Sequence, residues 1–398
     1  MSGRRALALA APVALALAAI AAAAVLLLRD EGGDASATPA PVRGQLDTCG
    51  AEFDDEAKRT CYAATLKRLV AASNDPRGVV RRISNVAWSE RRGFLLPNCH
   101  GLMHSVGREY ATAHGVRLET LMNYLPRSND PGCSAGFAHG LVSAVAPQID
   151  PGQPRAAAAV CDRAATRYQR YSCIHGFGHA FMRVYNEQLA PALELCRALG
   201  AEGSDCAQGA FHDYWFSVTR ADGTAPFDAR PELDPRVLCA AQRRDFVRPC
   251  WYRAFVDTRP RGFETRSPGD VESLCGGLEA LQRDACVTAA SVIGPPDPVE
   301  QLALCRELRR ADAVSCVHGT KVQNLLGSPM RVFVGVIRAC GRLAEEPRSA
   351  CYFWLGKTLS VVTGGRFARQ GCPALAASAR RACVEGARSM NGPLITFS

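Results

Sequence analysis

One repeated pattern decides the fold, and residues 193–212 show it most fully: LELCRALGAEGSDCAQGAFH. An apolar run ends at Cys196, a short segment of glycine and charged residues follows, and a second apolar run begins at Cys206. Glycine and short polar residues are typical of turns between periodic segments. The pattern therefore predicts two helices joined by a short turn, with one cysteine at each end of that turn.

The same cysteine spacing recurs along the chain, so we expect a disulfide across each turn. Two cysteines can bond only when their Cα atoms come within about 7 Å, and a tight helix–turn–helix meets that condition. Closing so short a loop stabilises the fold by about 2–3 kcal/mol through lost chain entropy. The eight pairs separated by 10 to 12 residues are Cys49–Cys61, Cys161–Cys173, Cys196–Cys206, Cys239–Cys250, Cys275–Cys286, Cys305–Cys316, Cys340–Cys351 and Cys372–Cys383.

The two remaining cysteines, Cys99 and Cys133, break this spacing. Neither has a cysteine about 11 residues before it, and each begins an apolar run in what should be neighbouring repeats. We therefore predict that Cys99 and Cys133 bond to each other and cross-link two adjacent repeats.

From Cys161 onward, the first cysteines of the pairs recur every 30 to 43 residues. That period is typical of helical-hairpin repeats, which must stack because one repeat cannot bury its apolar face alone. The run Val332–Ile337 resembles a strand, but its place before Cys340 favours the end of a helix. The predicted fold class is all-α, a disulfide-stapled helical-hairpin repeat array (α-solenoid) over residues 46–398.

The stretch Leu195–Gly209 resembles cysteine-rich, Sel-type tetratricopeptide-like repeats, in which a disulfide also joins one helix to the next across a short turn. The resemblance is one of architecture and covers residues 45–398. The glycine–valine turn and the recurrent aspartate of that family are missing here. The resemblance implies an elongated, curved solenoid that binds a protein or peptide partner in its groove, and it implies no catalytic residue.

The N-terminus predicts a membrane anchor. Arg4 and Arg5 precede an unbroken apolar run over the 23 residues 6–28. At 1.5 Å per residue that run crosses a hydrocarbon core of about 30 Å, and the arginines favour a cytoplasmic N-terminus. We therefore predict a signal anchor or transmembrane helix over 1–29, a flexible stalk over 30–45, and an extracytoplasmic remainder. The alternative is a secreted protein whose signal peptide is cleaved near Ala35-Ser36-Ala37.

The cysteine content and the charge narrow the choice of compartment and partner. The chain has 18 cysteines, an even number, and no CxxC spacing of the kind that binds zinc. Such a composition indicates an oxidising compartment outside the cytoplasm. The net charge is +9, but the basic residues are scattered among acids, so no nucleic-acid partner is expected.

Six of the eight histidines follow a register that indicates a metal site. Four of them stand three residues after a glycine in successive repeats, and the other two lie four residues earlier on the same helices. Imidazoles at positions i and i+4 share one helix face, and equivalent positions in stacked repeats form a row. Zinc or copper suits such ligands, and iron also fits. The predicted ligands are His100, His104, His139, His175, His179 and His212.

Later repeats lack the register histidines, which makes residues 95–215 a specialised, histidine-rich part. The equivalent positions there hold Val256, Val292, Val322, Lys357 and Ser389. His114 and His318 lie outside the register, and we interpret both as structural.

The histidines also allow two other interpretations. They could form a buried, hydrogen-bonded network in a metal-free scaffold, or include one catalytic histidine that needs no metal. Outer-shell carboxylates would come from Glu109, Glu187 or Asp213, each one or two turns past a histidine. The chain carries no HExxH, CxxCH or phosphate-binding loop, so the sequence assigns no enzyme class. Metal-dependent hydrolysis or oxidation would follow only if the site is catalytic.

Overall fold

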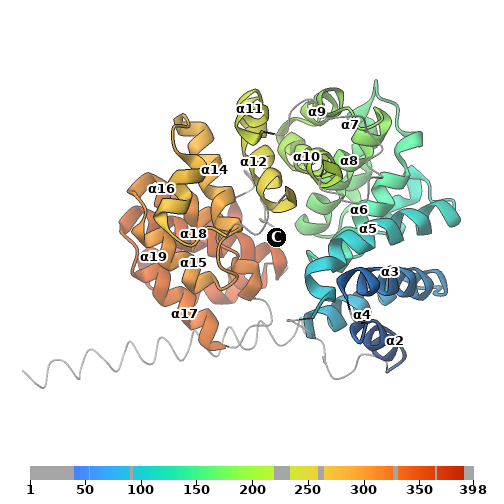
Figure 1. Cartoon of the computed structure of the whole chain (residues 1–398), viewed down its shortest axis with the longest axis horizontal. Coiled ribbons are helices and arrows are strands. Elements are labelled where there is room, and N and C mark those ends of the chain that lie inside the picture. Colours follow the sequence, from blue (N-terminus) through green and yellow to red (C-terminus); the bar gives the residue numbers. More distant parts are fainter. Residues whose placement is uncertain are drawn as a thin grey trace, which may run out of the picture. The chain divides into compact units, whose positions relative to one another are not determined.

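The structure is a computed structural model that describes residues 40–52, 54–89, 93–128, 130–218, 234–258, 264–325, 330–363 and 365–389. Every regular element in these ranges is a helix, which confirms the all-α prediction for the described part of the chain (Figure 1). The described helices fall into two compact units, one within residues 34–261 and the other within 262–397. The sequence analysis had treated residues 46–398 as one array.

The first unit contains eleven described α-helices and four short 3-10 turns, and it holds the six register histidines. Its α-helices are α2 (Ala40–Gly50), α3 (Asp55–Ala71), α4 (Pro76–Ser89), α5 (Leu95–Ala113), α6 (Cys133–Ala144), α7 (Pro154–Ala158), α8 (Arg167–Val184), α9 (Leu189–Ala198), α10 (Gly203–Val218), α11 (Pro235–Ala240) and α12 (Arg244–Thr258). The 3-10 turns are η2 (Leu118–Asn123), η3 (Ala146–Gln148), η4 (Ala159–Arg163) and η5 (Gly200–Glu202).

The second unit repeats the helix–turn–helix pattern without the register histidines. Its described elements are α13 (Pro268–Cys275), α14 (Ala280–Val292), α15 (Pro298–Glu307), α16 (Arg310–His318), η7 (Val322–Leu325), α17 (Met330–Gly341), α18 (Glu345–Val362), η8 (Phe367–Gly371), η9 (Cys372–Ala374) and α19 (Ala377–Arg388). Helix α17 contains residues 332–337, so the strand-like run there is helical, as its position before Cys340 predicts.

Side-chain caps set the starts of several helices. Asp54 accepts a hydrogen bond from the Ala57 amide at the start of α3, and Thr166 does the same for Gln169 at the start of α8. Each cap satisfies an amide that has no partner within the helix. Pro268 at the first turn of α13 has no N–H to leave unsatisfied, which is why proline is tolerated there.

The nine disulfides are those that the sequence predicts. Their Cα–Cα distances run from 4.9 Å for Cys99–Cys133 to 5.8 Å for Cys161–Cys173, and no cysteine is free. Cys99 lies in α5 and Cys133 begins α6, so this bond joins two helices that are separated by a long connection. Nine disulfides indicate an oxidising, extracytoplasmic environment.

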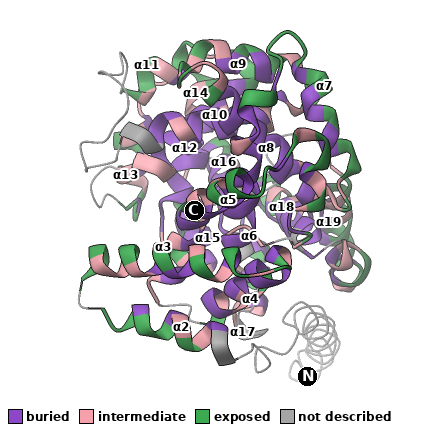
Figure 2. Ribbon diagram, turned by 90° about the vertical axis from the view of Figure 1, so that its right-hand side faces the viewer, coloured by how far each residue is buried: buried purple, intermediate pink, exposed green. Residues whose placement is uncertain are grey.

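Glycines bring paired helices into backbone contact. A Cβ added at Gly136 of α6 would lie 2.1 Å from the carbonyl oxygen of His100 in α5. A Cβ at Gly209 of α10 would lie 2.0 Å from the carbonyl oxygen of His175 in α8. The second unit repeats this contact, because a Cβ at Gly386 of α19 would lie 1.9 Å from the carbonyl oxygen of Phe353 in α18. Helix α8, which lies among such neighbours, is buried almost throughout (Figure 2).

The described residues correct part of the predicted stalk. Helix α2 begins at Ala40, so residues 40–45 are helical where the sequence analysis expected a flexible segment over 30–45. The reason is burial: Val42 is 5 % exposed and Leu46 is 1 % exposed, and α2 packs against α3 and α4. Residues 30–39 of the stalk and the whole anchor over 1–29 lie outside the described residues.

None of the helices in the described ranges combines the length and the apolar character that crossing a lipid bilayer requires.

Candidate metal centre

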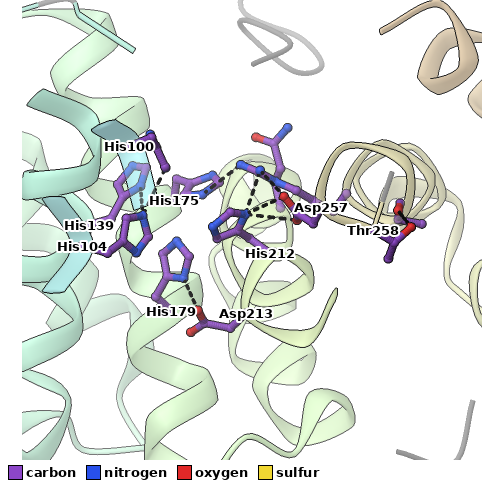
Figure 3. Close-up of polar contacts among 12 residues, drawn as sticks. His100, His104, His139, His175, His179, His212, Asp213, Asp257 and Thr258 are labelled. Carbon is purple, nitrogen blue, oxygen red and sulfur yellow. Dashed lines mark hydrogen bonds and ion pairs between the residues drawn. The ribbon is translucent and has the colours of Figure 1, made fainter. Parts of the chain in front are cut away.

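The six register histidines meet in one place, which we call the histidine cluster (Figure 3). His100 and His104 come from α5, His139 from α6, His175 and His179 from α8, and His212 from α10. The rings pack closely, with centroids 4.4 Å apart for His139 and His175 and 4.8 Å apart for His104 and His179. The structure thus brings together every histidine that the sequence predicts as a metal ligand.

The glycine three residues before a histidine has a structural role. Gly136, which precedes His139, lets α6 touch α5, and Gly209, which precedes His212, lets α10 touch α8. A Cβ at Gly176, three residues before His179, would lie 2.8 Å from Cβ of Val142 in α6. Because the backbones approach this closely, the side chains one helical turn later point into a shared space. The Gly-x-x-His register therefore builds the cluster.

Burial keeps most of the cluster uncharged. His139 is 2 % exposed, His175 is 1 % exposed, and His100 and His104 are half-buried. Burial, and after it the proximity of His212 and Arg253, lowers the pKa of His100 to about 3. Burial, and after it the charge of nearby histidines, also lowers the pKa of His104 and His139 well below the usual value. Neutral imidazoles offer the lone pair that a metal ion needs.

Three of the rings form what we call the outer triad: His100, His104 and His139. Nε2 of His104 lies 3.1 Å from Nε2 of His100 and 3.3 Å from Nδ1 of His139. Nitrogens bound tetrahedrally to zinc at 2.0–2.1 Å are separated from one another by about 3.3–3.4 Å. Two separations in the outer triad are therefore close to that value, and the three ligand atoms all lie within 4.8 Å of one another.

A backbone carbonyl fixes the orientation of His100. Nδ1 of His100 donates to the carbonyl oxygen of Pro131 at 2.9 Å, so Nε2 carries the lone pair and faces the outer triad. The turn that holds Pro131 is fixed by Asp130, whose carboxylate accepts hydrogen bonds from the Trp88 indole and the Ser134 amide, both at 2.8 Å. Metal-bound histidines commonly give their second N–H to a carbonyl or carboxylate in this way.

His179 faces a carboxylate with one ring nitrogen, and its other ring nitrogen has no hydrogen-bond partner among the described residues. Its Nδ1 lies 2.9 Å from Oδ1 of Asp213. Burial tends to raise the pKa of Asp213, but the charges of His179, His212 and Arg183 outweigh burial and lower that pKa. Among the described residues, no hydrogen-bond partner reaches Nε2 of His179, although the side chain is only 1 % exposed. An unsatisfied buried nitrogen costs about 1–3 kcal/mol, which a bound metal ion would recover.

Overlapping sets of ligand atoms extend beyond the outer triad. Ligand nitrogens of His104, His179 and His212 lie within 4.8 Å of one another, and so do those of His139, His175 and His179. His179 belongs to both sets, so it stands next to two members of the outer triad. It is the one histidine that these two sets share.

Helix α12 contributes an arginine and an aspartate to the opposite side of the cluster. Nη1 of Arg253 lies 2.8 Å from Nδ1 of His212, and Nη2 lies 3.5 Å from Nε2 of His175. Oδ2 of Asp257 lies 3.0 Å from Nδ1 of His212. Burial raises the pKa of Asp257 to about 7, although the charge of Arg253 works in the opposite direction.

The sequence analysis found only one of the two carboxylates. Asp213 contacts His179 as an outer-shell acid should, whereas Glu109 instead pairs with Lys67 at 2.7 Å. Glu187 lies in a left-handed turn after α8, with a φ of 67°. Asp257 was missed although a signal exists, because it stands seven residues after Cys250 as Asp213 stands seven residues after Cys206.

The two histidines outside the register lie outside the cluster. His114 stacks on Tyr110 with ring centroids 4.0 Å apart, and it ends α5. The ring of His318 lies 5.9 Å from that of Trp354, within the second unit.

No protein-family model, curated protein or solved structure matches this chain.

Proposed function

We propose that the protein is an extracytoplasmic binder of a transition metal ion, held by His100, His104 and His139 with His179 as the fourth ligand. The observation that carries the proposal is the outer triad, whose nitrogens converge at 3.1 and 3.3 Å. Four imidazole ligands suit zinc or copper, and iron is the next choice. The ion would satisfy Nε2 of His179, a buried nitrogen that no hydrogen-bond partner reaches within the described part of the chain.

The surroundings of the cluster support binding at neutral pH. A proton and a metal ion compete for the same lone pair, and the lowered pKa values of His100, His104 and His139 remove that competition. The carboxylate of Asp213 adds negative charge beside His179 and so favours a cation. A closed set of four ligands favours holding or handing over the ion. Catalysis of hydrolysis or oxidation would require an open coordination position.

The wider architecture is part of the same proposal. We infer that residues 1–29 anchor the protein in a membrane and that the helix pairs stack as an α-solenoid of the Sel-type kind. The supporting observations are the apolar run over residues 6–28 and the glycine contact repeated in both units. A protease-protection assay on intact cells would test the anchor.

Metal analysis of matched variants tests the function. The full chain would be purified from an oxidising compartment, incubated with zinc or with copper, and freed of loose metal. We expect about one ion per chain by elemental analysis, and almost none in the double variant His104→Ala and His139→Ala. The matched control changes His114→Ala and His318→Ala, which lie outside the cluster, and it should bind as the wild type does. A wild type without stoichiometric metal after reconstitution would contradict the proposal.

The competing function is a metal-free scaffold that binds a protein or peptide partner. Its support is that the contacts of His104 with His100 and His139 also fit hydrogen bonds between imidazoles. In that case added zinc or copper would leave the melting temperature unchanged. A site-bound ion at one hundred times its Kd would instead stabilise the fold by about 2.7 kcal/mol.

A further inference from the structure

An arginine lies inside the histidine cluster and is not explained by binding of a single ion. Arg253 is 3 % exposed, and its guanidinium lies between His175 and His212. Its nearest acid, Asp257, is also buried and lies 3.3 Å from Nη1. Among the described residues, no hydrogen-bond partner reaches Nε of Arg253.

The contacts of Arg253 are those that a metal ion would make. A guanidinium has only donors, so Nε2 of His175 presents a lone pair to it, and so does Nδ1 of His212 in the tautomer that leaves this nitrogen unprotonated. Lone pairs of the same kind bind metal ions. Two imidazoles and a carboxylate are also a common donor set for divalent transition metals.

We propose that Arg253 occupies a second metal position, formed by His175, His212 and Asp257, and so limits the cluster to one ion. The inference rests on the proposed function, because it assigns the first ion to the outer triad and His179. The positive charge of Arg253 neutralises the carboxylate of Asp257, as a second metal ion would do if it were bound at this position.

The decisive experiment is a count of ions in Arg253→Gln. Cobalt(II), detected by its visible spectrum, and zinc, measured by elemental analysis, serve as probes on the full chain. We expect one ion in the wild type and two in Arg253→Gln. Adding Asp257→Asn to that variant should bring the count back to one. Arg253→Lys retains the cation and should bind one ion.

A matched control separates this effect from a general loss of positive charge near the cluster. Arg183 donates to Ser143 and lies close enough to Asp213 to lower its pKa, but it makes no contact with His175 or His212 in the described structure. Arg183→Gln should therefore still bind one ion. Two ions in that variant would overturn the assignment to Arg253.

A second measurement decides the matter if Arg253→Gln does not fold. The double variant His175→Ala and His212→Ala leaves the outer triad and His179 intact, so we expect it to bind one ion with wild-type stoichiometry. Loss of that ion would overturn the division of the cluster into two positions. Two ions in the wild type, or one ion in a folded Arg253→Gln, would overturn it as well. A wild type that binds no ion contradicts the proposed function itself.

Discussion

Asp130 controls the metal site without touching the metal position. Its carboxylate accepts from Trp88, Ser84 and two backbone amides, and this fixes the carbonyl of Pro131 that orients His100. The substitution Asp130→Asn replaces one acceptor oxygen with an NH2 group. That group would face the N–H and O–H donors of its neighbours and could not form hydrogen bonds with them. Outer-shell changes of this kind weaken metal binding by about 10- to 100-fold.

We therefore expect Asp130→Asn to lower the metal affinity by about tenfold or more, measured by competition with a chelator. Asp150 provides the matched control, because its Oδ1 accepts from the Gly152 amide as Asp130 accepts from the Gly132 amide, but far from the cluster. Asp150→Asn should bind metal as the wild type does. An unchanged affinity in Asp130→Asn would show that the turn does not orient His100.

At the scale of helices, the contact between α5 and α6 sets the distance between the members of the outer triad. Gly136 has no room for a side chain, since a Cβ would lie 2.1 Å from the carbonyl oxygen of His100. Gly136→Ala must push the helices apart, and overpacking of this kind costs about 1–3 kcal/mol. We expect a lower unfolding midpoint together with weaker metal binding.

Two glycine variants separate packing from metal binding. Gly356→Ala creates a similar clash in the second unit, where a Cβ would lie 1.9 Å from the carbonyl oxygen of Cys383, so it should destabilise without weakening metal binding. Gly44→Ala in α2 meets nothing within 4 Å and should be neutral or stabilise by up to about 1 kcal/mol. If Gly136→Ala binds metal like Gly356→Ala, the α5–α6 contact does not shape the site.

At the scale of the whole chain, the cluster makes the stability of the metal-free protein depend on pH. Five of its histidines, including His100 with a pKa of about 3, have lowered pKa values in the folded state. An unfolded histidine binds a proton below about 6.5, so on acidification the unfolded state takes up more protons and stability falls. Asp257, whose pKa is raised to about 7, has the opposite effect on the pH dependence of stability. It is a single group, however, and the histidines with lowered pKa values are five.

The free energy of unfolding in a chelator should therefore fall by at least about 1.4 kcal/mol per pH unit below pH 6.5, the effect of one net proton. Denaturant titrations between pH 8 and pH 5 would measure the decrease. Saturating zinc should raise the denaturant midpoint of unfolding at every pH at which the ion stays bound, including pH 7. A flat profile between pH 6.5 and pH 5 would show that the histidines are not buried and neutral.

The local spacing of cysteines, glycines and histidines predicts the disulfides and the histidine cluster well. Contacts between packed helices cannot be predicted from such spacing. The pairing of Cys196 with Cys206 follows from their separation of ten residues across a short turn, and the Gly-x-x-His register places His139 beside His104 because the repeats are alike. The position of Arg253 depends on how α12 packs against α10, and no local pattern encodes that contact. The helical start at Ala40 was missed because Val42 and Leu46 are buried through packing of α2 against α3 and α4, which the local composition of residues 30–45 does not reveal.

The order of the disulfides has a consequence for how the protein matures. Each of the nine bonds, Cys99–Cys133 included, joins a cysteine to the next cysteine along the chain. As a chain emerges from a translocation channel, each new thiol therefore meets its correct partner as the most recent unpaired one. Simple oxidation in order of emergence yields the native set, and no bond needs to be broken and remade. Such a protein suits cells that export it with an oxidase and without a dedicated disulfide isomerase.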